Sequence, residues 1–208
     1  AAARQINAEV DCISFYELDP RRTFSRSDFT ESRYTTASPL AGTILVDSGG
    51  EGCYTRGSGW PGEYGVRYIM LGWCYASRHQ GSMVHELLHA LGMAHEHQRR
   101  DAFNRFAGHG PYNKLLIGED DESYAQYAAA DSAYMGSVGL GGYAPFDYDS
   151  IMMYPTSREM VTRPYTKVRG HLAGQHDHRT GQRNSLSRWD VAQLQDMFGC
   201  LSGRARFR

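Results

Sequence analysis

No hydrophobic run in this sequence is long enough to cross a membrane. The run from Tyr68 to Ala76 is far shorter than the roughly 20 residues that a spanning helix needs. A surplus of one charge is also missing, because 22 Lys and Arg stand against 23 Asp and Glu, for a formal net charge of −1. We therefore expect no membrane span and no nucleic-acid partner. The basic end of the chain, 204–208, is expected to be a solvated tail.

Cysteine is scarce as well, with four in 208 residues, and their spacing does not resemble the paired Cys-x-x-Cys of a zinc site. Four cysteines allow three disulfide pairings, and the sequence alone does not choose between them. Free thiols in a reducing compartment, or a metal held by cysteine, are the alternatives. We favour disulfides and a secreted protein.

Three of the nine histidines, in contrast, lie in one stretch that reads HELLHALGMAH. On a helix, His85 and His89 lie on one face, one turn apart, where two imidazoles can take two corners of a tetrahedral zinc site. Glu86 lies at the edge of that face, where it can reach a water on the metal without ligating the metal. Gly92 permits a sharp turn of the backbone, after which His95 can approach the same metal. Three protein ligands and one open corner are typical of a catalytic zinc site.

A helix with this pattern can also be a solvated, charged face that binds no metal, so a second signal is needed. The long form of the motif predicts a methionine turn further along the chain. The segment Ser150–Tyr154, with the sequence Ser-Ile-Met-Met-Tyr, matches that turn. The two elements together predict one Zn²⁺ per chain.

The local patterns predict helices around this motif and at the end of the chain. The motif helix is expected to take Ser82 as its N-cap and to bury a stripe of apolar residues. Near the end, Ser187 and Asp190 form a capping-box pattern, and Gly199 is expected to end the helix. The expected buried residues are Val84, Leu87, Leu88 and Leu91 in the first helix, and Val191, Leu194 and Phe198 in the last.

Elsewhere the sequence predicts short strands and loops. The residues up to Val10 have the character of the end of a helix. Strands are expected over Cys12–Tyr16, Gly42–Asp47 and Val66–Leu71, which are rich in β-branched, aromatic and apolar residues. The stretch from Phe106 to Tyr148 is rich in Gly, Ala and Tyr and is expected to be mostly loop.

From His95 onward the chain resembles one family of metzincin zinc peptidases, the astacins, which follow the third histidine with glutamate, here Glu96. The methionine turn resembles the astacin version of that turn. Three further stretches look like landmarks of the same family: Cys12–Phe15, Gly72–Cys74 and Gly181–Ser187. The resemblance covers most of the chain.

The resemblance implies specific roles for the residues that match. It implies that His85, His89 and His95 are the zinc ligands and that Glu86 is the general base. Tyr154 would be an additional ligand in the resting enzyme, and would swing away to hydrogen-bond the oxyanion of the transition state. Met152 would form a hydrophobic floor under the metal. The implied disulfides are Cys12–Cys200 and Cys53–Cys74.

The same resemblance implies an α+β fold, the two-lobed metzincin catalytic domain, with residues 1–208 as a single domain. The N-terminal lobe, about 1–92, would hold a twisted sheet and the active-site helix. The C-terminal lobe, about 93–208, would be mostly irregular and end in a helix. In the family, a strand and the first part of a long helix precede the segment that matches Ala1–Cys12; we expect the N-terminal end here to lack them or to be organised differently.

Substrate contacts are predicted less directly. By analogy with the family, Val66–Leu71 would be the sheet edge above the cleft, with Tyr68 and Met70 binding an extended peptide as an added strand. An ordinary core strand fits the same residues. Arg183 is a candidate for the pocket that receives the residue after the cleaved bond, where it would favour acidic side chains; a solvated loop is the alternative.

A second metal cluster is conceivable in the loop that holds His171, His176, Asp177 and His178, but an exposed polar loop is the better interpretation.

The sequence as a whole predicts a secreted, monomeric zinc metalloendopeptidase that hydrolyses internal bonds of protein or peptide substrates bound in extended form. The alternatives are another zinc hydrolase, an inactive fragment, or a catalytically impaired zinc protein that only binds peptides. Retention of both Glu86 and Tyr154 argues against the last of these.

Overall fold

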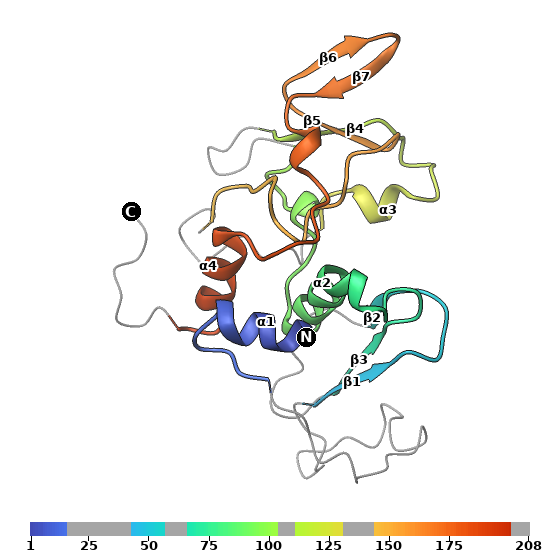
Figure 1. Ribbon diagram of the computed structural model, residues 1–208. Coiled ribbons are helices and arrows are strands. Elements are labelled where there is room, and N and C mark those ends of the chain that lie inside the picture. The colour runs from blue at the N-terminus through green and yellow to red at the C-terminus, as the bar shows by residue number, and fades with distance from the viewer. Residues whose placement is uncertain (16–42, 57–65, 104–110, 131–143, 201–208) are drawn as a thin grey trace. The chain divides into compact units, whose positions relative to one another are not determined.

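The computed structural model describes residues 1–15, 43–56, 66–103, 111–130 and 144–200 (Figure 1). The chain divides into two compact units, Ala1–Met93 and Ala94–Arg208. Helices and small sheets are mixed along the chain, so the expected α+β class is confirmed. The basic tail at 204–208 lies outside the described residues.

The first unit combines a three-stranded sheet with helices. Its elements are α1 (Ala2–Glu9), β1 (Thr43–Asp47), β2 (Tyr54–Arg56), β3 (Val66–Met70), the 3₁₀ turn η4 (Ser77–His79) and α2 (Gln80–Leu91). The strand order is β1-β3-β2, with β1 parallel to β3 and β2 antiparallel to it. The strands expected over Gly42–Asp47 and Val66–Leu71 are therefore confirmed as β1 and β3.

The expectation that Val66–Leu71 forms the edge of the sheet is wrong. β3 lies between two partners: Tyr68 pairs with Leu45 on one side and with Arg56 on the other. A strand whose two hydrogen-bonding sides are both occupied cannot take on a peptide as a further strand. Within the described part of the chain, β2 is the antiparallel edge strand.

The strand expected over Cys12–Tyr16 is absent from the part that can be described, which ends at Phe15. Instead, the side chain of Asn7 accepts a hydrogen bond from the amide of Phe15 at 2.7 Å and donates one to its carbonyl oxygen at 2.9 Å. These bonds satisfy the backbone of Phe15 without a neighbouring strand. The helix expected up to Val10 is confirmed as α1, with Ile6 and Val10 fully buried.

The second unit has short strands and one longer helix. Its elements are η5 (Glu96–Gln98), β4 (Asn113–Leu115), α3 (Tyr124–Tyr127), β5 (Met160–Thr162), β6 (Tyr165–Val168), β7 (His171–Gly174), η6 (Asp177–Arg179) and α4 (Arg188–Met197). β4 pairs with β5, and β6 with β7, both antiparallel. Its core cluster consists of Ala102, Phe146, Tyr148, Met153 and Met160.

The last helix begins as the sequence predicts. The Ser187 hydroxyl accepts from the amides of Trp189 and Asp190, and the Asp190 carboxylate accepts from the amide of Ser187, which completes a capping box. Gly199 follows the helix with φ +68°, a left-handed conformation that glycine adopts without strain. The predicted buried stripe is only partly right, because Leu194 is fully buried but Phe198 is exposed.

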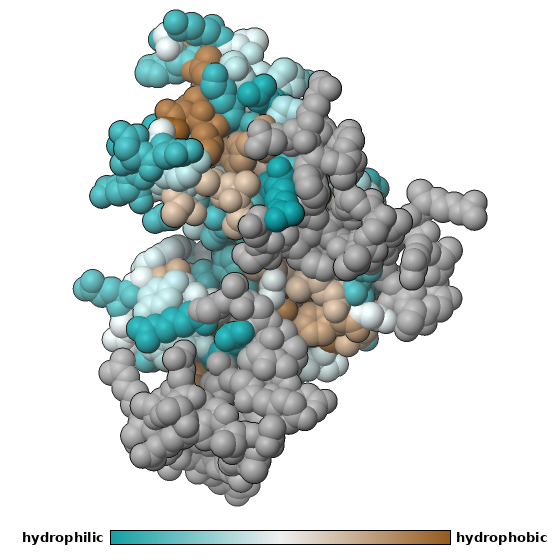
Figure 2. All heavy atoms as spheres, turned by 180° about the vertical axis from the view of Figure 1, so that it is seen from behind, coloured by the Kyte–Doolittle hydropathy of each residue, from teal (hydrophilic) through white to brown (hydrophobic). Residues whose placement is uncertain are grey.

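On the face shown in Figure 2, hydrophobic residues gather in a few separate areas among hydrophilic ones. The described residues form no helix that is both long and apolar enough to span a bilayer.

Candidate functional site

The helix α2 carries the first part of the site and is anchored by its apolar face. Val84, Leu87, Leu88 and Leu91 are all buried, as their spacing predicts. The helix begins at Gln80 after η4, so Ser82 lies inside it and the predicted N-cap at Ser82 is wrong. Gly92 ends the helix with φ +113°, and its amide donates to carbonyl oxygens of the last turn. The chain reverses here because glycine tolerates this conformation.

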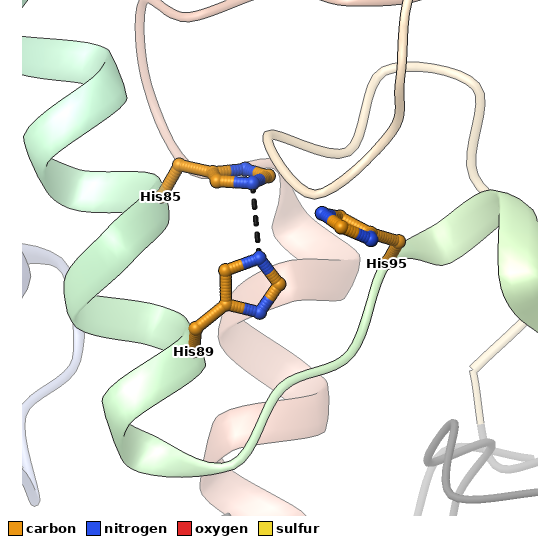
Figure 3. A group of neighbouring side chains, drawn as sticks. All are labelled: His85, His89 and His95. Carbon is orange, nitrogen blue, oxygen red and sulfur yellow. Dashed lines mark hydrogen bonds between the residues drawn. The ribbon is translucent and has the colours of Figure 1, made fainter. Parts of the chain in front are cut away.

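Three imidazoles come together around the end of this helix (Figure 3). The Nε2 atoms of His85 and His89 are 3.1 Å apart, and the two ring centroids are 4.6 Å apart. One ligand atom from each of His85, His89 and His95 lies within 4.8 Å of the others. His85 is buried, and the other two are half-buried. Among the described residues this is the one group of His, Cys, Asp or Glu placed to hold a metal ion.

The remaining ring nitrogens explain how two of these histidines are oriented. Nδ1 of His89 lies 2.7 Å from the carbonyl oxygen of Met93, and Nδ1 of His95 lies 3.0 Å from Oε1 of Gln98. Each Nδ1–H can donate to its oxygen, which leaves the Nε2 lone pair for a metal. Two imidazoles that present Nε2 in this way, together with the neighbouring ring of His85, fit a zinc ion.

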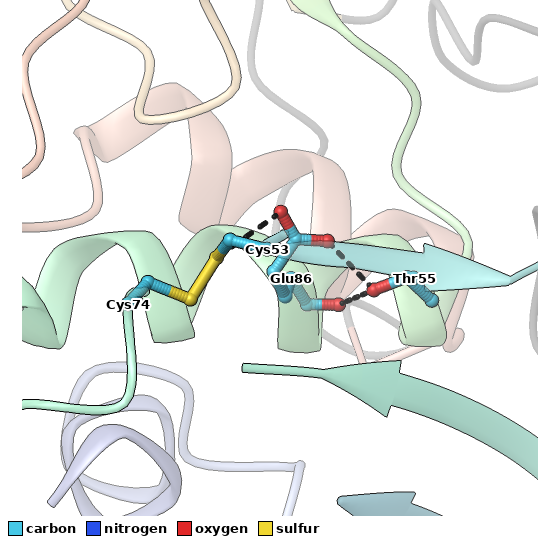
Figure 4. The surroundings of a disulfide bond; sticks show 4 residues. All are labelled: Cys53, Thr55, Cys74 and Glu86. Atoms are coloured by element: carbon cyan, nitrogen blue, oxygen red, sulfur yellow. Dashed lines mark hydrogen bonds between the residues drawn. A yellow bond between two sulfur atoms is a disulfide. The ribbon is translucent and has the colours of Figure 1, made fainter. Parts of the chain in front are cut away.

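Glu86 follows the first of these histidines and is buried, with 6% of its surface exposed. The hydroxyl of Thr55, in β2, lies 2.8 Å from Oε2 of Glu86 and 2.8 Å from its backbone oxygen (Figure 4). The Sγ of Cys53 lies 3.9 Å from Oε1. Because Cys53 is in a disulfide with Cys74, its sulfur has no hydrogen to donate, and we regard this as a packing contact.

The predicted methionine turn is a tight, buried turn. The amide of Met153 donates to the carbonyl of Ser150 at 3.1 Å, and the amide of Met152 donates to the Ser150 hydroxyl at 3.0 Å. The carbonyl of Met152 accepts from the amide of Glu96, the residue after His95. The methionine turn is thereby tied to the segment that carries the third histidine.

Tyr154 completes this part of the site. Its ring lies 4.2 Å from the ring of His95 and 4.4 Å from the ring of His97, measured between centroids. The ring is half-buried. This packing holds the phenol beside one of the three grouped imidazoles.

Asp190 links α4 to the methionine turn, a role that its capping-box position did not predict. Besides capping the helix, its carboxylate accepts from the hydroxyl of Ser150 at 2.5 Å and from the amide of Ile151 at 2.9 Å. Burial raises the pKa of Asp190 to about 6, although hydrogen bonds from Ser150, Ile151 and Ser187 favour the charged form.

A buried ion-pair network next to His95 was also not predicted from the sequence. Arg99, 1% exposed, donates to both oxygens of Asp101 and to Oε1 of Glu96, at 2.9 to 3.0 Å. The amide of Asp147 donates to Glu96 at 2.8 Å. Burial raises the pKa of Glu96 to about 7, against the opposing effect of Arg99. In the sequence, the only sign of this network is the close spacing of the oppositely charged residues Glu96, Arg99 and Asp101.

The residues predicted to contact substrate, and those considered as a second metal cluster, make ordinary contacts with their surroundings. Nη1 of Arg183 donates to the carbonyl of Met153 at 3.1 Å, beside the methionine turn. Tyr68 donates to Asp47 at 2.7 Å, and Met70 is buried on the central strand. The described part of the chain shows no metal-binding group around His171–His178. There Asp177 instead accepts from the backbone and hydroxyl of Thr162.

The structure has a disulfide between Cys53 and Cys74, with Cα atoms 5.8 Å apart. Cys12 and Cys200 are also disulfide-bonded, and no described cysteine is a free thiol. The alternative of four free thiols is therefore wrong.

Comparison with known proteins agrees with this geometry. The model of the peptidase family described as Astacin matches residues 28–199. The chain is 28% identical to high choriolytic enzyme 1 of Oryzias latipes over 72% of this chain and 48% of that protein. It is also 28% identical to astacin-like metalloprotease toxin 1 of Loxosceles intermedia, over 58% of this chain and 42% of the toxin. The chain thus spans less than half the length of these curated relatives.

A solved structure shows the same fold. That structure is high choriolytic enzyme 1, a hatching enzyme zinc-protease from Oryzias latipes (medaka fish). It superposes with a TM-score of 0.58 at 25% identity and covers 96% of this chain and 80% of its own. The α+β, two-lobed metzincin fold is therefore confirmed. From the family match over 28–199 and this likeness of fold, we conclude that the chain belongs to the astacin family of peptidases.

Proposed function

We propose that this protein is a secreted zinc metalloendopeptidase that hydrolyses internal peptide bonds of proteins. The observation that carries the proposal is the group of three histidines whose ligand atoms lie within 4.8 Å of one another, with the buried carboxylate of Glu86 next to the first of them in the chain. Membership of the astacin family supports it.

One Zn²⁺ per chain would be held by His85, His89 and His95, with Tyr154 as an additional ligand in the resting enzyme. When bound, zinc lowers the pKa of a coordinated water toward about 7 and polarises a substrate carbonyl. Met152, which is fully buried, would form the hydrophobic floor under the metal.

Glu86 would act as the general base. Its carboxylate takes a proton from the attacking water and then delivers that proton to the leaving nitrogen of the peptide. While the water attacks, and before the nitrogen leaves, the hydroxyl of Tyr154 would donate to the oxyanion that develops on the substrate. A single oxyanion donor contributes roughly 3–4 kcal/mol in other enzymes. The packing of Tyr154 against His95 supports this role.

The substrate would bind in extended form along the edge strand β2, rather than along β3 as the sequence suggested. Antiparallel addition of a peptide to such an edge uses the unpaired backbone groups of the strand. Arg183 would favour an acidic side chain in the pocket after the cleaved bond, because its guanidinium lies beside the methionine turn. We propose that residues 1–208 form one catalytic domain, and that the protein is a monomer and is secreted, because its described cysteines are disulfide-bonded.

Cleavage of casein, with and without a zinc chelator and followed by zinc add-back, tests the proposal. We expect cleavage that the chelator abolishes and zinc restores. If the protein binds zinc but leaves casein intact, the proposal is wrong and the alternative of a catalytically impaired peptide-binding protein is favoured.

A further inference from the structure

The edge strand β2 contacts Glu86 through one side chain. The hydroxyl of Thr55 lies 2.8 Å from Oε2 of the carboxylate and 2.8 Å from the backbone oxygen of the same residue (Figure 4). Thr55 and Glu86 lie 31 residues apart in the sequence, so this contact depends on the fold of the first unit.

A threonine hydroxyl has a single proton, so it can donate to only one of these two oxygens at a time. The backbone oxygen of Glu86 lies in α2, where the helix already provides an amide donor for such carbonyls. The carboxylate is the stronger acceptor because it is charged. We therefore assign the proton to Oε2, which becomes the anchored oxygen of Glu86.

Thr55 itself is held in place without help from Glu86. It pairs with Ile69 in the antiparallel ladder between β2 and β3, and Ile69 is almost fully buried. Two residues before it, the disulfide between Cys53 and Cys74 ties the start of β2 to the segment that precedes α2. Because side chains alternate along a strand, its neighbours Tyr54 and Arg56 face away and are exposed. A fixed strand thus presents one half-buried hydroxyl to the carboxylate.

We propose that Thr55 is a positioning residue for Glu86: its hydroxyl holds Oε2 by a hydrogen bond and so fixes the orientation of the carboxylate that takes up and delivers the proton. This inference rests on the proposed function, in which Glu86 is the general base. It also has a geometric consequence. The residue that orients the base belongs to the strand along which the peptide would bind, so base and substrate would share one rigid support.

Thr55→Val tests the inference, because valine keeps the branched shape and the strand propensity but lacks the hydroxyl. Thr55→Ser keeps the hydroxyl. Thr166→Val, on the exposed strand β6, is the matched control for the same chemical change. We would measure kcat and KM on a quenched-fluorescent peptide, together with zinc content and the thermal midpoint of unfolding.

For Thr55→Val we expect kcat to fall roughly 10- to 100-fold per zinc-loaded, folded molecule, with KM and zinc content unchanged. Thr55→Ser should recover most of that loss, and Thr166→Val should behave as the parent. A merely structural role for Thr55 would lower the thermal midpoint but leave the kcat of the folded molecules intact.

A parental kcat in Thr55→Val would overturn the inference while the proposed function stood. Failure of Thr55→Ser to recover activity would overturn it as well. Should Thr55→Val fail to fold, Thr55→Ala, which only removes atoms, provides the same comparison. A zinc-loaded parent that cleaves neither casein nor the peptide would overturn the proposed function, and this inference with it.

Discussion

Glu86 is buried, and we propose that its carboxylate acts as the general base. Replacement by glutamine keeps the buried side chain but removes the base. Glu86→Gln keeps the size of the side chain and an oxygen that can accept from Thr55, but it cannot take up a proton at neutral pH. We expect kcat to fall roughly 10²- to 10⁴-fold, with zinc content unchanged. Peptide cleavage and metal analysis of the purified variant would check this. Turnover at the parental rate would remove Glu86 from the mechanism.

Gln98 would act on the proposed metal site through His95, one of its three proposed ligands. Its Oε1 accepts from Nδ1 of His95, the kind of outer contact that sets the tautomer and orientation of a metal-binding imidazole. Gln98→Leu removes that acceptor at similar volume, and we expect zinc affinity to fall roughly 10- to 100-fold. Competition with a zinc-binding dye measures the affinity.

The control for this experiment is Gln126→Leu, the same change at an exposed position in α3, which should bind zinc as the parent does. Equal affinities in Gln98→Leu and Gln126→Leu would mean that His95 is oriented without help from Gln98.

At the scale of elements, the start of α4 and the methionine turn share one carboxylate. Ser187→Ala removes only the N-cap and should lower the free energy of unfolding by about 1 kcal/mol. Asp190→Ala also leaves the hydroxyl of Ser150 and the amide of Ile151 without their acceptor, and should cost about 2–4 kcal/mol. Denaturant unfolding compares the two variants. Equal losses would show that Asp190 stabilises the helix alone.

The contact between Asp190 and the methionine turn also connects α4 to the proposed active site. Ser150 begins the turn that carries Met152, and Tyr154 follows directly after it. Anchoring of the turn by α4 therefore places the phenol that packs on His95. We expect Asp190→Ala to lower kcat as well as stability, whereas Ser187→Ala lowers stability only.

At the scale of the whole molecule, Asp190 makes stability depend on pH. Burial raises its pKa to about 6 in the folded state, from an ordinary value of 3.8. Between these values the folded protein binds more protons than the unfolded chain, so its stability falls as the pH rises from about 4 to about 6. This contribution is fully present below pH 4 and lost above pH 6.

Comparison with Asp190→Asn tests this effect, because asparagine does not titrate. Groups whose pKa does not depend on Asp190 cancel, whereas Glu96, whose pKa the Asp190 charge helps to raise, adds a smaller difference in the same pH range. We expect the parent to lose up to ~3 kcal/mol of stability relative to Asp190→Asn between pH 4 and pH 7. Urea unfolding of both proteins across this range is the measurement. A constant difference between them would mean that the folded and unfolded states share one pKa.

The sequence by itself determined the features that depend on neighbours along the chain. The spacing of His85 and His89 puts both on one helical face, Gly92 ends that helix, and Ser187 with Asp190 caps the last one. The β-branched, aromatic and apolar composition of residues 42–47 and 66–71 predicted strands, which the structure contains as β1 and β3. Each of these features depends on a few residues that lie close together in the sequence.

The tertiary structure alone decided which groups meet across long stretches of chain. It placed β3 between two strands, which leaves β2 as the edge along which we propose that a peptide binds. It also satisfied the backbone of Phe15 through Asn7 in place of a strand. It brought Thr55 to Glu86 and Asp190 to Ser150. Local pattern cannot specify such contacts, because a hydroxyl or carboxylate has the same sequence signature whatever partner the fold provides.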